Sequence, residues 1–546
     1  MSNRTRTDAL LIAGFCAFLF FYGAGQFGLI GADEPRYAQV AREMLEKHEW
    51  VTPILNHEPW LEKPPLYYWE AMLAYTAFGV SDSAARLPSG FNATLLVLGT
   101  YFFFRRFRKN VEADAALITA SCAGLVGYAR AASMDMALAS TFTIGMLAWW
   151  GWRESGKKIY LAAFYAFIAL GTLAKGPIAP FLAAAVIVVY AIAARELRVV
   201  GKMLRIPGIL LFFAIALPWY VAVQMRNPEF FRIFILEHNL GRFSKDLYHH
   251  REPFWYYLPV TAIALVPWIV FVATSLARIM RVWWAEFAGG PRKPSVGETD
   301  FEFRLNVFAA CWLIVPVVFF SISQSKLPGY ILPAIPAGAI LLADSLRQSL
   351  MDAENVPVSK WLAVLHAVAA SAWIVPALLI AYLATQHRLP GGRPLYTALA
   401  IALVICGAIV FTLVRQQGLR MLRFVTLIPV MLAIYATLKL GAPALDQTIT
   451  ARPLAHEIAS VETRPITLAV YGVSRELEYG LTFYRNQVTK RYEWGTVPSE
   501  EHLLVTPEHW QTEIAKQVNG RRVAFLGHYE AQRLDYYWVA AANNTR

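Results

Sequence analysis

The stretch GADEPRYAQVAREML, at residues 31–45, places two acids and a base directly after an apolar run that is long enough to cross a bilayer. Charge beside lipid is costly, so Asp33, Glu34 and Arg36 need a reason to be there. Asp33 or Glu34 could cap a helix that begins at Pro35, where the helix dipole favours an acid. Either could instead do acid–base chemistry, and a cap can also hold a catalytic carboxylate at a fixed angle.

A second charged pair, Glu62 and Lys63, lies in WLEKPPLYYW, just before two prolines that force an extended, stiff turn. These side chains could form a surface ion pair, which contributes little to stability. Alternatively, Lys63 binds a phosphate and Glu62 is its partner or a metal ligand. Asp135, in ARAASMDMAL, raises a similar choice, because it could cap the helix that follows or take part in chemistry.

Three further motifs carry bases next to apolar segments. Lys175 is the single charge in LAKGPIAP, and a lysine at membrane depth usually lines a cavity or pairs with an anion. Lys326 and Tyr330, in SQSKLPGYILP, could be a snorkelling lysine and an interfacial tyrosine. The segment 235–259, ILEHNLGRFSKDLYHHREPFWYYLP, is rich in bases and histidines, most of which could simply be solvated.

The elements that must position these motifs are apolar blocks. The chain has 546 residues, 57% of them hydrophobic, and the blocks run for about 18–22 residues, the length at which a helix crosses a bilayer. We therefore predict a mainly α, polytopic membrane protein with about 13 transmembrane helices. The first block lacks a cleavage site after it and should be retained. The expected spans are 9–30, 88–104, 111–129, 136–152, 159–174, 177–194, 206–223, 256–275, 305–322, 329–346, 361–383, 395–414 and 424–441. Between 159 and 194, Lys175-Gly176-Pro177 could be a tight turn or a break within one segment.

The net charge of +12 is explained by the loops between these spans, so no nucleic-acid partner is needed. The positive-inside rule places the basic N-terminus and the basic loops in the cytoplasm. These loops are RRFRK (105–109), RESGKK (153–158), RELRVVGKMLR (195–205) and RQQGLRMLR (415–423).

Alternation of the spans then brings all the charged motifs to the external face. That face comprises residues 31–87, 130–135, 224–255, 323–328 and the chain after about residue 442. Anionic headgroups attract cations, but acids at separate places are less expected from lipid binding alone. A lipid phosphate substrate, with acids nearby for chemistry, would account for both.

Two external regions have structure of their own. In the first loop, residues 37–45 are apolar at helical spacing, which predicts an amphipathic helix in the interface, and residues 64–78 are a second candidate. After the membrane domain (1–441), residues 442–546 contain the apolar strands TLAVYGV, HLLVT and RRVAFLG between the helical segments SRELEYGLTFYR and PEHWQTEIAKQV. We predict a small soluble α/β domain there.

Two further signals limit the chemistry. The four cysteines all lie inside apolar spans and should be small buried hydrophobes rather than disulfides or metal ligands. They are Cys16, Cys122, Cys311 and Cys406. The sequence has no P-loop or glycine-rich cradle, so we expect no nucleotide cofactor.

Taken in order, GADEPRYAQVAREML, WLEKPPLYYW, AKG, EHNLGRFSKDLYHHREPFWYYLP and SKLPGYILP resemble the bacterial aminoarabinose transferases of lipid A. These enzymes belong to the protein O-mannosyltransferase-like, GT-C group of membrane glycosyltransferases. The resemblance covers residues 8–346. It implies an inner-membrane enzyme that moves a sugar, 4-amino-4-deoxy-L-arabinose, from undecaprenyl phosphate to lipid A or another periplasmic acceptor. With the positive-inside topology, the N-terminus is expected in the cytoplasm and the C-terminal domain in the periplasm. We also expect a monomer surrounded by membrane lipids.

The resemblance further implies roles for individual residues. Asp33 matches the catalytic carboxylate and Asp135 a second acid, and Glu34 is a third catalytic candidate. Glu62 and His250 are the candidates for binding a divalent metal ion, zinc or magnesium. The residues expected at the donor phosphate are Lys63, Arg36, Tyr37, Lys175, Lys326 and Tyr330.

Cations at the phosphate would stabilise the negative charge that develops as it leaves, and attack would pass through an oxocarbenium-like state. Asp33 would be a general base for a hydroxyl acceptor. For a phosphate acceptor, it would orient groups and stabilise positive charge on the sugar.

Other classes of protein remain open. A lipid-linked glycan transporter or flippase would show two-fold hydropathy symmetry and midplane charges, whereas the charges here lie at one face. A membrane scaffold would tolerate replacement of Asp33 by Asn. Within the transferases, the alternative is a protein or polysaccharide glycosyltransferase that resembles the mannosyltransferases.

Overall fold

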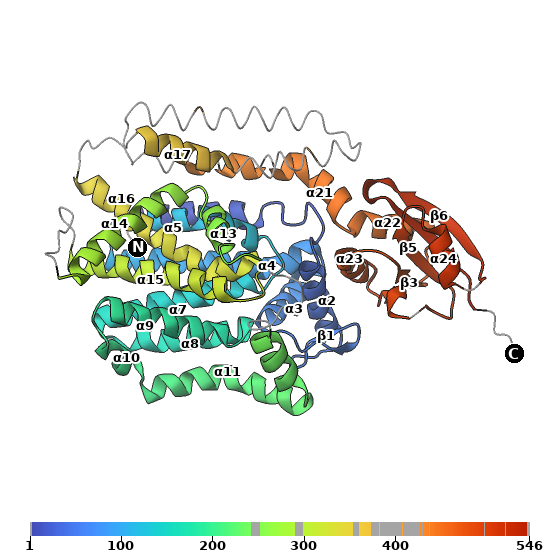
Figure 1. Ribbon diagram of the computed structural model, residues 1–546, viewed down its shortest axis with the longest axis horizontal. Coiled ribbons are helices and arrows are strands. Elements are labelled where there is room, and N and C mark those ends of the chain that lie inside the picture. Colours follow the sequence, from blue (N-terminus) through green and yellow to red (C-terminus); the bar gives the residue numbers. More distant parts are fainter. Residues whose placement is uncertain are drawn as a thin grey trace.

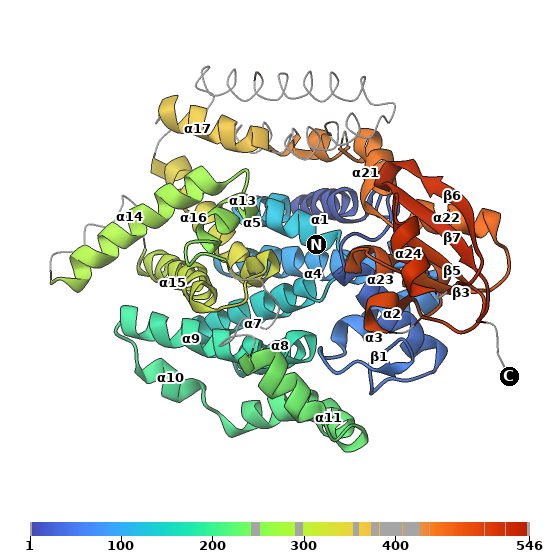
Figure 2. The ribbon, with the colours of Figure 1, turned by 45° about the vertical axis from the view of Figure 1, so that its right-hand side comes forward.

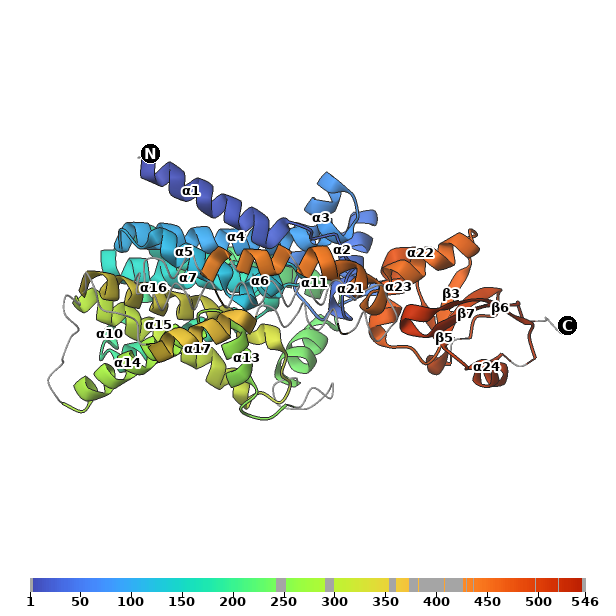
Figure 3. The ribbon, with the colours of Figure 1, turned by 90° about the horizontal axis from the view of Figure 1, so that it is seen from above.

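The chain forms an elongated bundle of helices with a small sheet domain at one end (Figure 1). The computed structural model describes residues 3–241, 252–289, 299–352, 360–372, 382, 407 and 426–542 apart from 429, 436, 496 and 519. Seen from above, the start of the first helix lies at one end of the molecule and the sheet domain at the other (Figure 3). The predicted fold class, mainly α with a small C-terminal α/β part, is confirmed.

The bundle consists of helices of very different length. In chain order they are α1 (Asn3–Cys16), α4 (Asp82–Phe107), α5 (Glu112–Ser121), α6 (Ala123–Ala129), α7 (Asp135–Ser155), α8 (Lys158–Lys175), α9 (Ile178–Ala193), α10 (Arg198–Met203), α11 (Ile206–Arg226), α13 (Tyr257–Ala264), α14 (Ile269–Phe287), α15 (Asp300–Ile322), α16 (Ile335–Asp352) and α17 (Lys360–Ser371). Short π- and 3-10 turns join some of them, among them η1 (Ala17–Phe21), η2 (Phe231–Gly241) and η3 (Pro328–Ala334).

By length and apolar composition, four described helices could cross a membrane, and six could if two sharply bent pairs are each counted as one span. The four are α4, α8, α11 and α15. This number is smaller than the expected 13 because several apolar segments are short or broken. The expected span at 395–414 and the end of the one at 361–383 lie, except for residues 407 and 382, outside the described residues, as does Cys406.

Two expected spans prove to be broken helices. The span at 256–275 is wrong as a single helix, because α13 and α14 meet at 116° across a break that contains Pro267. Proline has no N–H for the next helical hydrogen bond. The span at 111–129 divides at Cys122, where the Ala123 N–H donates to the Val266 carbonyl at 2.8 Å instead of to its own helix. The two breaks therefore contact each other.

A tight turn ends α8 at Lys175 and starts α9 at Ile178. Gly176 adopts φ +85° in this turn, a conformation that favours glycine. Of the two structures that the sequence left open, the turn is therefore the one observed. It leaves the Lys175 side chain at the end of its helix.

The first loop folds into the two helices that its periodicity predicts, α2 (Asp33–Glu46) and α3 (Leu66–Phe78), with a short hairpin of β1 (Ile54–Leu55) and β2 (Glu58–Pro59) between them. The apolar face of α2 packs on α3 and on the start of α4. Tyr75 of α3 donates from its hydroxyl to the Ala38 carbonyl at 3.2 Å, and Tyr67 donates to the Ala85 carbonyl at 2.8 Å. This packing fixes the first turn of α2 against the bundle.

The C-terminal domain is a five-stranded mixed sheet in the order β4-β3-β5-β7-β6. The three predicted strands are present as β3 (Thr467–Val470), β5 (His502–Pro507) and β6 (Val523–Tyr529), while sequence analysis missed β4 (Lys490–Arg491) and β7 (Leu534–Val539). Strand β5 is parallel to β3 and antiparallel to β7. Helices α21 (Ala442–Ile449), α22 (Arg452–Val461), α23 (Arg475–Arg485) and α24 (Gln511–Gln517) accompany the sheet. Helix α23 lies beside α2 of the first loop (Figure 2).

Candidate active site

A cavity of about 1330 Å³ lies where the first loop, the ends of α7 and α8, the turn η3 and the C-terminal domain meet. Nine of the eleven residues that the sequence singled out line it, although they come from four separate parts of the chain. They are Asp33, Glu34, Arg36, Tyr37, Glu62, Lys63, Asp135, Lys175 and Tyr330.

Asp33 occupies the first turn of α2 and forms an ion pair with Arg36 one turn later. The Asp33 side chain is 53% exposed, so the carboxylate faces the cavity while it is held on one side. Burial alone would lower the pKa of Arg36, but the neighbouring Tyr37, Asp33 and Glu62 raise it above its ordinary value. Arg36 therefore stays charged.

Helix capping does not explain either acid of the first loop. The N-cap of α2 is Ala32, and no side chain caps the helix, so the expected cap at Asp33 or Glu34 is wrong. Glu34 instead accepts hydrogen bonds from the buried Arg86 at 2.7 Å and from the N–H groups of Ile30 and Ala132 at 2.9 and 3.0 Å. Both of its carboxylate oxygens are thus occupied by the protein, which supports a positioning role rather than a catalytic one.

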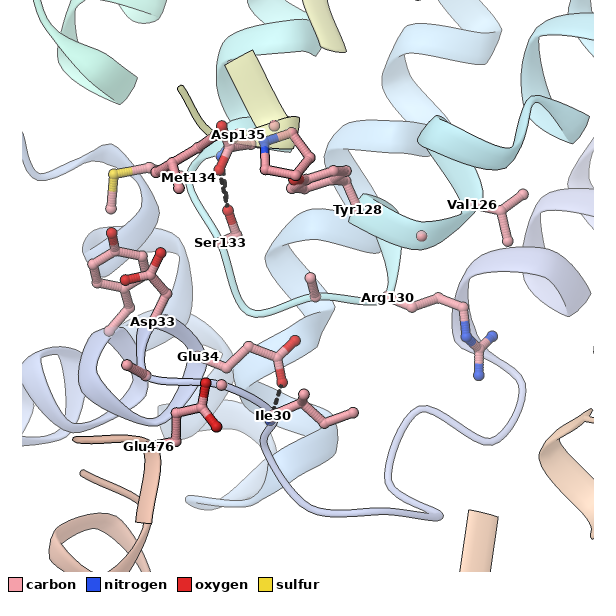
Figure 4. A pocket seen from close by; sticks show the side chains of 18 of the residues that line it. Ile30, Asp33, Glu34, Val126, Tyr128, Arg130, Ser133, Met134, Asp135 and Glu476 are labelled. Atoms are coloured by element: carbon pink, nitrogen blue, oxygen red, sulfur yellow. Dashed lines mark hydrogen bonds between the residues drawn. The ribbon is translucent and has the colours of Figure 1, made fainter. Parts of the chain in front are cut away.

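Asp135 begins α7 and pairs with Lys175 at the end of α8. Ser133 donates a second hydrogen bond to Asp135 at 2.6 Å (Figure 4). Burial would raise the pKa of Asp135, but Lys175, Ser133 and Lys63 hold it below its ordinary value, so the carboxylate is charged. The expected cap at Asp135 is also wrong, because Met134 is the N-cap of α7 and no side chain caps it.

The turn η3 closes the cavity over this pair. The Lys175 ammonium lies 4.6 Å from the centre of the Tyr330 ring, within cation–π range. A Cβ atom at Gly329 would lie 2.8 Å from both Asp135 Oδ1 and the Tyr128 hydroxyl, so only glycine allows this close approach. The sequence SKLPGY thus brings Tyr330 to the two helix ends, but its Lys326 does not line the cavity. Lys326 is buried and donates to the Ser323 carbonyl at 2.6 Å.

The predicted metal ligands are only partly described. Glu62 lines the cavity, and its Oε1 lies 3.7 Å from Nε2 of His238, one of the histidines of the segment 235–259. His250 lies outside the described residues. Within the described part of the chain, no three histidine, cysteine or acidic side chains gather as a metal site would require. A carboxylate and an imidazole are both ligand types that divalent cations accept.

The C-terminal domain supplies part of the cavity wall that sequence analysis missed. Ser474, Arg475 and Glu476, at the start of α23, line the cavity and are exposed in it. Figure 4 shows Glu476 on the same side of the cavity as Asp33 and Glu34. The sequence predicts a helix for the segment SRELEYGLTFYR, but nothing local marks its first turn as part of a site whose first acid, Asp33, lies more than 400 residues earlier in the sequence.

Polar contacts fasten the C-terminal domain to the first loop. Arg452 donates to Asp82 at 2.8 Å and to Asp446 at 2.6 Å. The Tyr484 hydroxyl donates to Asp82 at 2.6 Å and accepts from the Leu29 N–H at 2.7 Å. Arg42, on α2, donates to the Phe483 carbonyl at 2.8 Å. These bonds fix the start of α23 over the cavity.

The other half of the cavity is apolar. Its walls come from helices on both sides of the bundle, and they could accommodate a hydrocarbon chain whose head reaches the charged half. Residues of this half include Val126, Ile263, Val266, Ile434 and Leu438.

Comparisons with known proteins agree with this geometry. Residues 9–234 match the family described as dolichyl-phosphate-mannose-protein mannosyltransferase. The chain is 30% identical over 363 residues to the undecaprenyl phosphate-alpha-4-amino-4-deoxy-L-arabinose arabinosyl transferase of Pseudomonas paraeruginosa, a match that covers 65% of this chain and 62% of that protein. It is 26% identical to the protein of the same name from Erwinia tasmaniensis, with 87% of both chains covered.

The fold is that of a solved structure. The crystal structure of ArnT from Cupriavidus metallidurans bound to undecaprenyl phosphate superposes with a TM-score of 0.76 at 23% identity, covering 97% of both chains. The apo structure of the same protein gives a TM-score of 0.73 at 21% identity, covering 98% of both chains. The likeness thus includes the C-terminal domain as well as the helices.

Proposed function

We propose that this chain is a membrane glycosyltransferase of the GT-C group that includes the aminoarabinose transferases, to which it is similar. We propose that it transfers 4-amino-4-deoxy-L-arabinose from undecaprenyl phosphate to a phosphate of lipid A. One observation carries the proposal. Two carboxylates, each paired with a base, face one cavity whose other half is apolar. Such a cavity suits a donor that has a lipid tail, an anionic phosphate and a sugar.

In this mechanism the donor's tail lies in the apolar half and its phosphate meets Lys63 and the Lys175–Asp135 pair. The acceptor oxygen forms a bond to the anomeric carbon while the bond from that carbon to the phosphate oxygen breaks. The electron pair leaves on undecaprenyl phosphate, where the lysines stabilise it. Asp33 stabilises the positive charge that develops on the sugar ring, and a phosphate acceptor needs no general base because it is already ionised.

Acidic residues in the cavity favour an amino sugar over a neutral hexose. Glu476 lies at the start of α23, exposed in the cavity, and among the described residues no base forms an ion pair with it. A protonated 4-amino group would supply that partner. The description of the matched family, which names mannose and protein, makes a mannosyltransferase-like enzyme the second candidate.

The orientation in the membrane belongs to the proposal. The start of α1 lies at the end of the bundle away from the cavity (Figure 3), and the basic loops predicted to be cytoplasmic include 105–109, at the end of α4 that is remote from the site. We place the cavity on the periplasmic side of the inner membrane. The proposal also takes the protein to act as a monomer.

The test is mass spectrometry of lipid A from a Gram-negative host that makes lipid-linked aminoarabinose but lacks its own transferase. The host expresses this chain unchanged, with Asp33→Asn, or with Lys516→Ala, an exposed change on the C-terminal domain away from the cavity. A pentosamine mass gain with the unchanged chain and Lys516→Ala, but not with Asp33→Asn, is the expected result. No gain from a membrane-inserted unchanged chain overturns this donor–acceptor pair and turns the test to hexose donors and to protein acceptors.

A further inference from the structure

The cavity holds cations from both halves of the molecule. Within the described residues, Lys63, Lys175, Arg36 and Arg130 come from the bundle and the first loop, and Arg475 comes from the C-terminal domain. The proposed reaction brings two anionic groups into this cavity, the donor phosphate and the acceptor. Because like charges repel, the acceptor needs a cation of its own.

Three of these cations already contact partners within the protein. Lys175 pairs with Asp135, and Arg36 pairs with Asp33. The guanidinium of Arg130 donates to the carbonyl groups of Leu19 and Tyr22, at 3.0 and 2.7 Å, and points away from the acids (Figure 4). Arg130 thus holds η1 and the residue after it, on the side of the cavity away from Asp33.

Arg475 is held only loosely. Its side chain is exposed in the cavity, and its Nη2 donates to the Tyr479 hydroxyl at a long 3.4 Å. Within the described part of the chain, no carboxylate forms an ion pair with it. Its guanidinium lies 5.9 Å from the Tyr479 ring, and Arg36 lies 5.5 Å from the same ring. The two guanidinium groups thus share Tyr479 as a neighbour.

The position of Arg475 is nevertheless well defined by its backbone. Ser474 caps α23 by accepting from the Leu477 N–H at 3.3 Å, and α23 is fastened to the first loop through Tyr484 and Phe483. A fixed backbone with an exposed guanidinium that makes one long hydrogen bond suits the recognition of a bulky anion. The fork of an arginine matches two oxygens of a phosphate.

Resting on the proposed function, we propose that Arg475 binds the phosphate of the acceptor lipid. The C-terminal domain is then the part of the protein that recognises the acceptor, while Lys63 and Lys175 serve the donor. The acceptor phosphate attacks the anomeric carbon through one ionised oxygen, and the guanidinium holds the other two. No proton or further reactant is needed for this step.

The experiment uses the purified full chain in detergent, with undecaprenyl phosphate-linked aminoarabinose as donor and bisphosphorylated lipid A as acceptor. The variants are Arg475→Ala, Arg475→Lys and the control Arg522→Ala, an exposed arginine of the same domain that does not line the cavity. We expect Arg475→Ala to raise the acceptor KM about tenfold, which corresponds to about 1.4 kcal/mol. The donor KM should change less than about twofold, the lysine variant should recover part of the loss, and Arg522→Ala should match the unchanged chain.

Equal acceptor KM values for Arg475→Ala and Arg522→Ala, in folded protein, overturn the inference. A matching rise in the donor KM also overturns it, because Arg475 would then serve the donor. A parallel measurement separates this inference from the proposed function: thermal stabilisation of each protein by lipid A without donor. If the unchanged chain binds lipid A but transfers no sugar, the proposed function fails, and the inference stands only if Arg475→Ala weakens that binding. No binding of lipid A by the unchanged chain overturns both.

Discussion

The two ends of the helix bundle carry the same kinds of charged residues, but the cavities described at them differ greatly in size. Helix α7 runs between them, from Asp135 at the cavity to Arg153 at the far end. At the far end, Arg153 pairs with Glu196, Glu196 pairs with Arg304, and Arg108 pairs with Glu302 in the interior. The cavity described there is only about 70 Å³, compared with about 1330 Å³ at the other end.

The difference lies in what each ion pair faces. The Glu302 side chain is 7% exposed and its partner Arg108 is 3% exposed, so this pair closes the contact between α4 and α15. The Asp33 side chain is 53% exposed although it too has a partner. An ion pair whose two side chains are both buried holds helices together. An ion pair with one side chain exposed to a cavity remains available to a substrate. Changes at the two ends should therefore have different consequences.

The largest expected effect is on activity and comes from Asp135→Asn. The amide keeps the size of the carboxylate but removes the charge that Lys175 neutralises. We expect the transfer rate per folded molecule to fall at least 100-fold. The melting temperature in detergent should fall as well, because Lys175 loses its partner at the junction of α7 and α8. Since the pKa of Asp135 is held below its ordinary value, its protonation should cause no loss of activity between about pH 5 and 8. A rate within threefold of the unchanged chain would place Asp135 with the structural pairs.

Substitutions at the end of the bundle remote from the cavity should lower stability rather than activity. Arg108→Met leaves the Glu302 carboxylate buried without its partner, which costs about 3–5 kcal/mol. We expect a lower melting temperature but unchanged activity per folded molecule at low temperature. The double variant Arg108→Met/Glu302→Leu is the control, because removing both charges should restore most of the stability. Loss of activity without loss of stability in Arg108→Met would contradict the division between the two ends.

A smaller effect on activity is expected at Glu62. If Glu62 and a histidine bind a divalent cation, chelation should slow the unchanged chain about 10- to 100-fold and have no further effect on Glu62→Gln. Elemental analysis of the purified protein checks for zinc or magnesium directly. His238→Ala and His250→Ala, compared side by side, show which histidine takes part. Metal-free protein with full activity would leave the Glu62–His238 contact as a structural pair.

The smallest expected effect concerns an acid at the cavity end of the bundle that does not itself line the cavity. Glu70, on α3, accepts a hydrogen bond from Asn92 at 2.9 Å, and burial raises its pKa from 4.5 to about 7. Because the folded protein then binds this proton more tightly than the unfolded chain, stability is full below about pH 4.5 and falls as pH rises through about 7.

We expect Glu70→Gln to abolish this loss of stability at high pH. At pH 8 its free energy of unfolding should exceed that of the unchanged chain by about 1–3 kcal/mol, and its activity should not change. Melting temperatures of both proteins between pH 4.5 and 8 provide the measurement. The Asp135→Asn protein is the matched control, since its pH dependence should follow that of the unchanged chain. Identical curves for Glu70→Gln and the unchanged chain would show that Glu70 does not titrate in this range.

The sequence by itself determined the helical class and the two helices of the first loop. Each of these depends on residues that are near neighbours in the chain, such as the apolar spacing of 37–45. At Lys175 the sequence left a turn and a break open, and the structure shows the turn. The order of charged motifs also identified most of the residues that line the cavity. Capping, which is a local property too, was nevertheless the wrong explanation for Asp33 and Asp135, because stronger partners were available from elsewhere in the chain.

Only the tertiary structure decided those partners. Asp135 and Lys175 are 40 positions apart, Glu62 lies beside His238, and the start of α23 reaches the cavity from the C-terminal domain. Each contact depends on how whole elements pack, including the 116° bend between α13 and α14. Local periodicity specifies which face of a helix is buried, but the partner that covers it is chosen by the shape and charge of distant segments once the chain is compact.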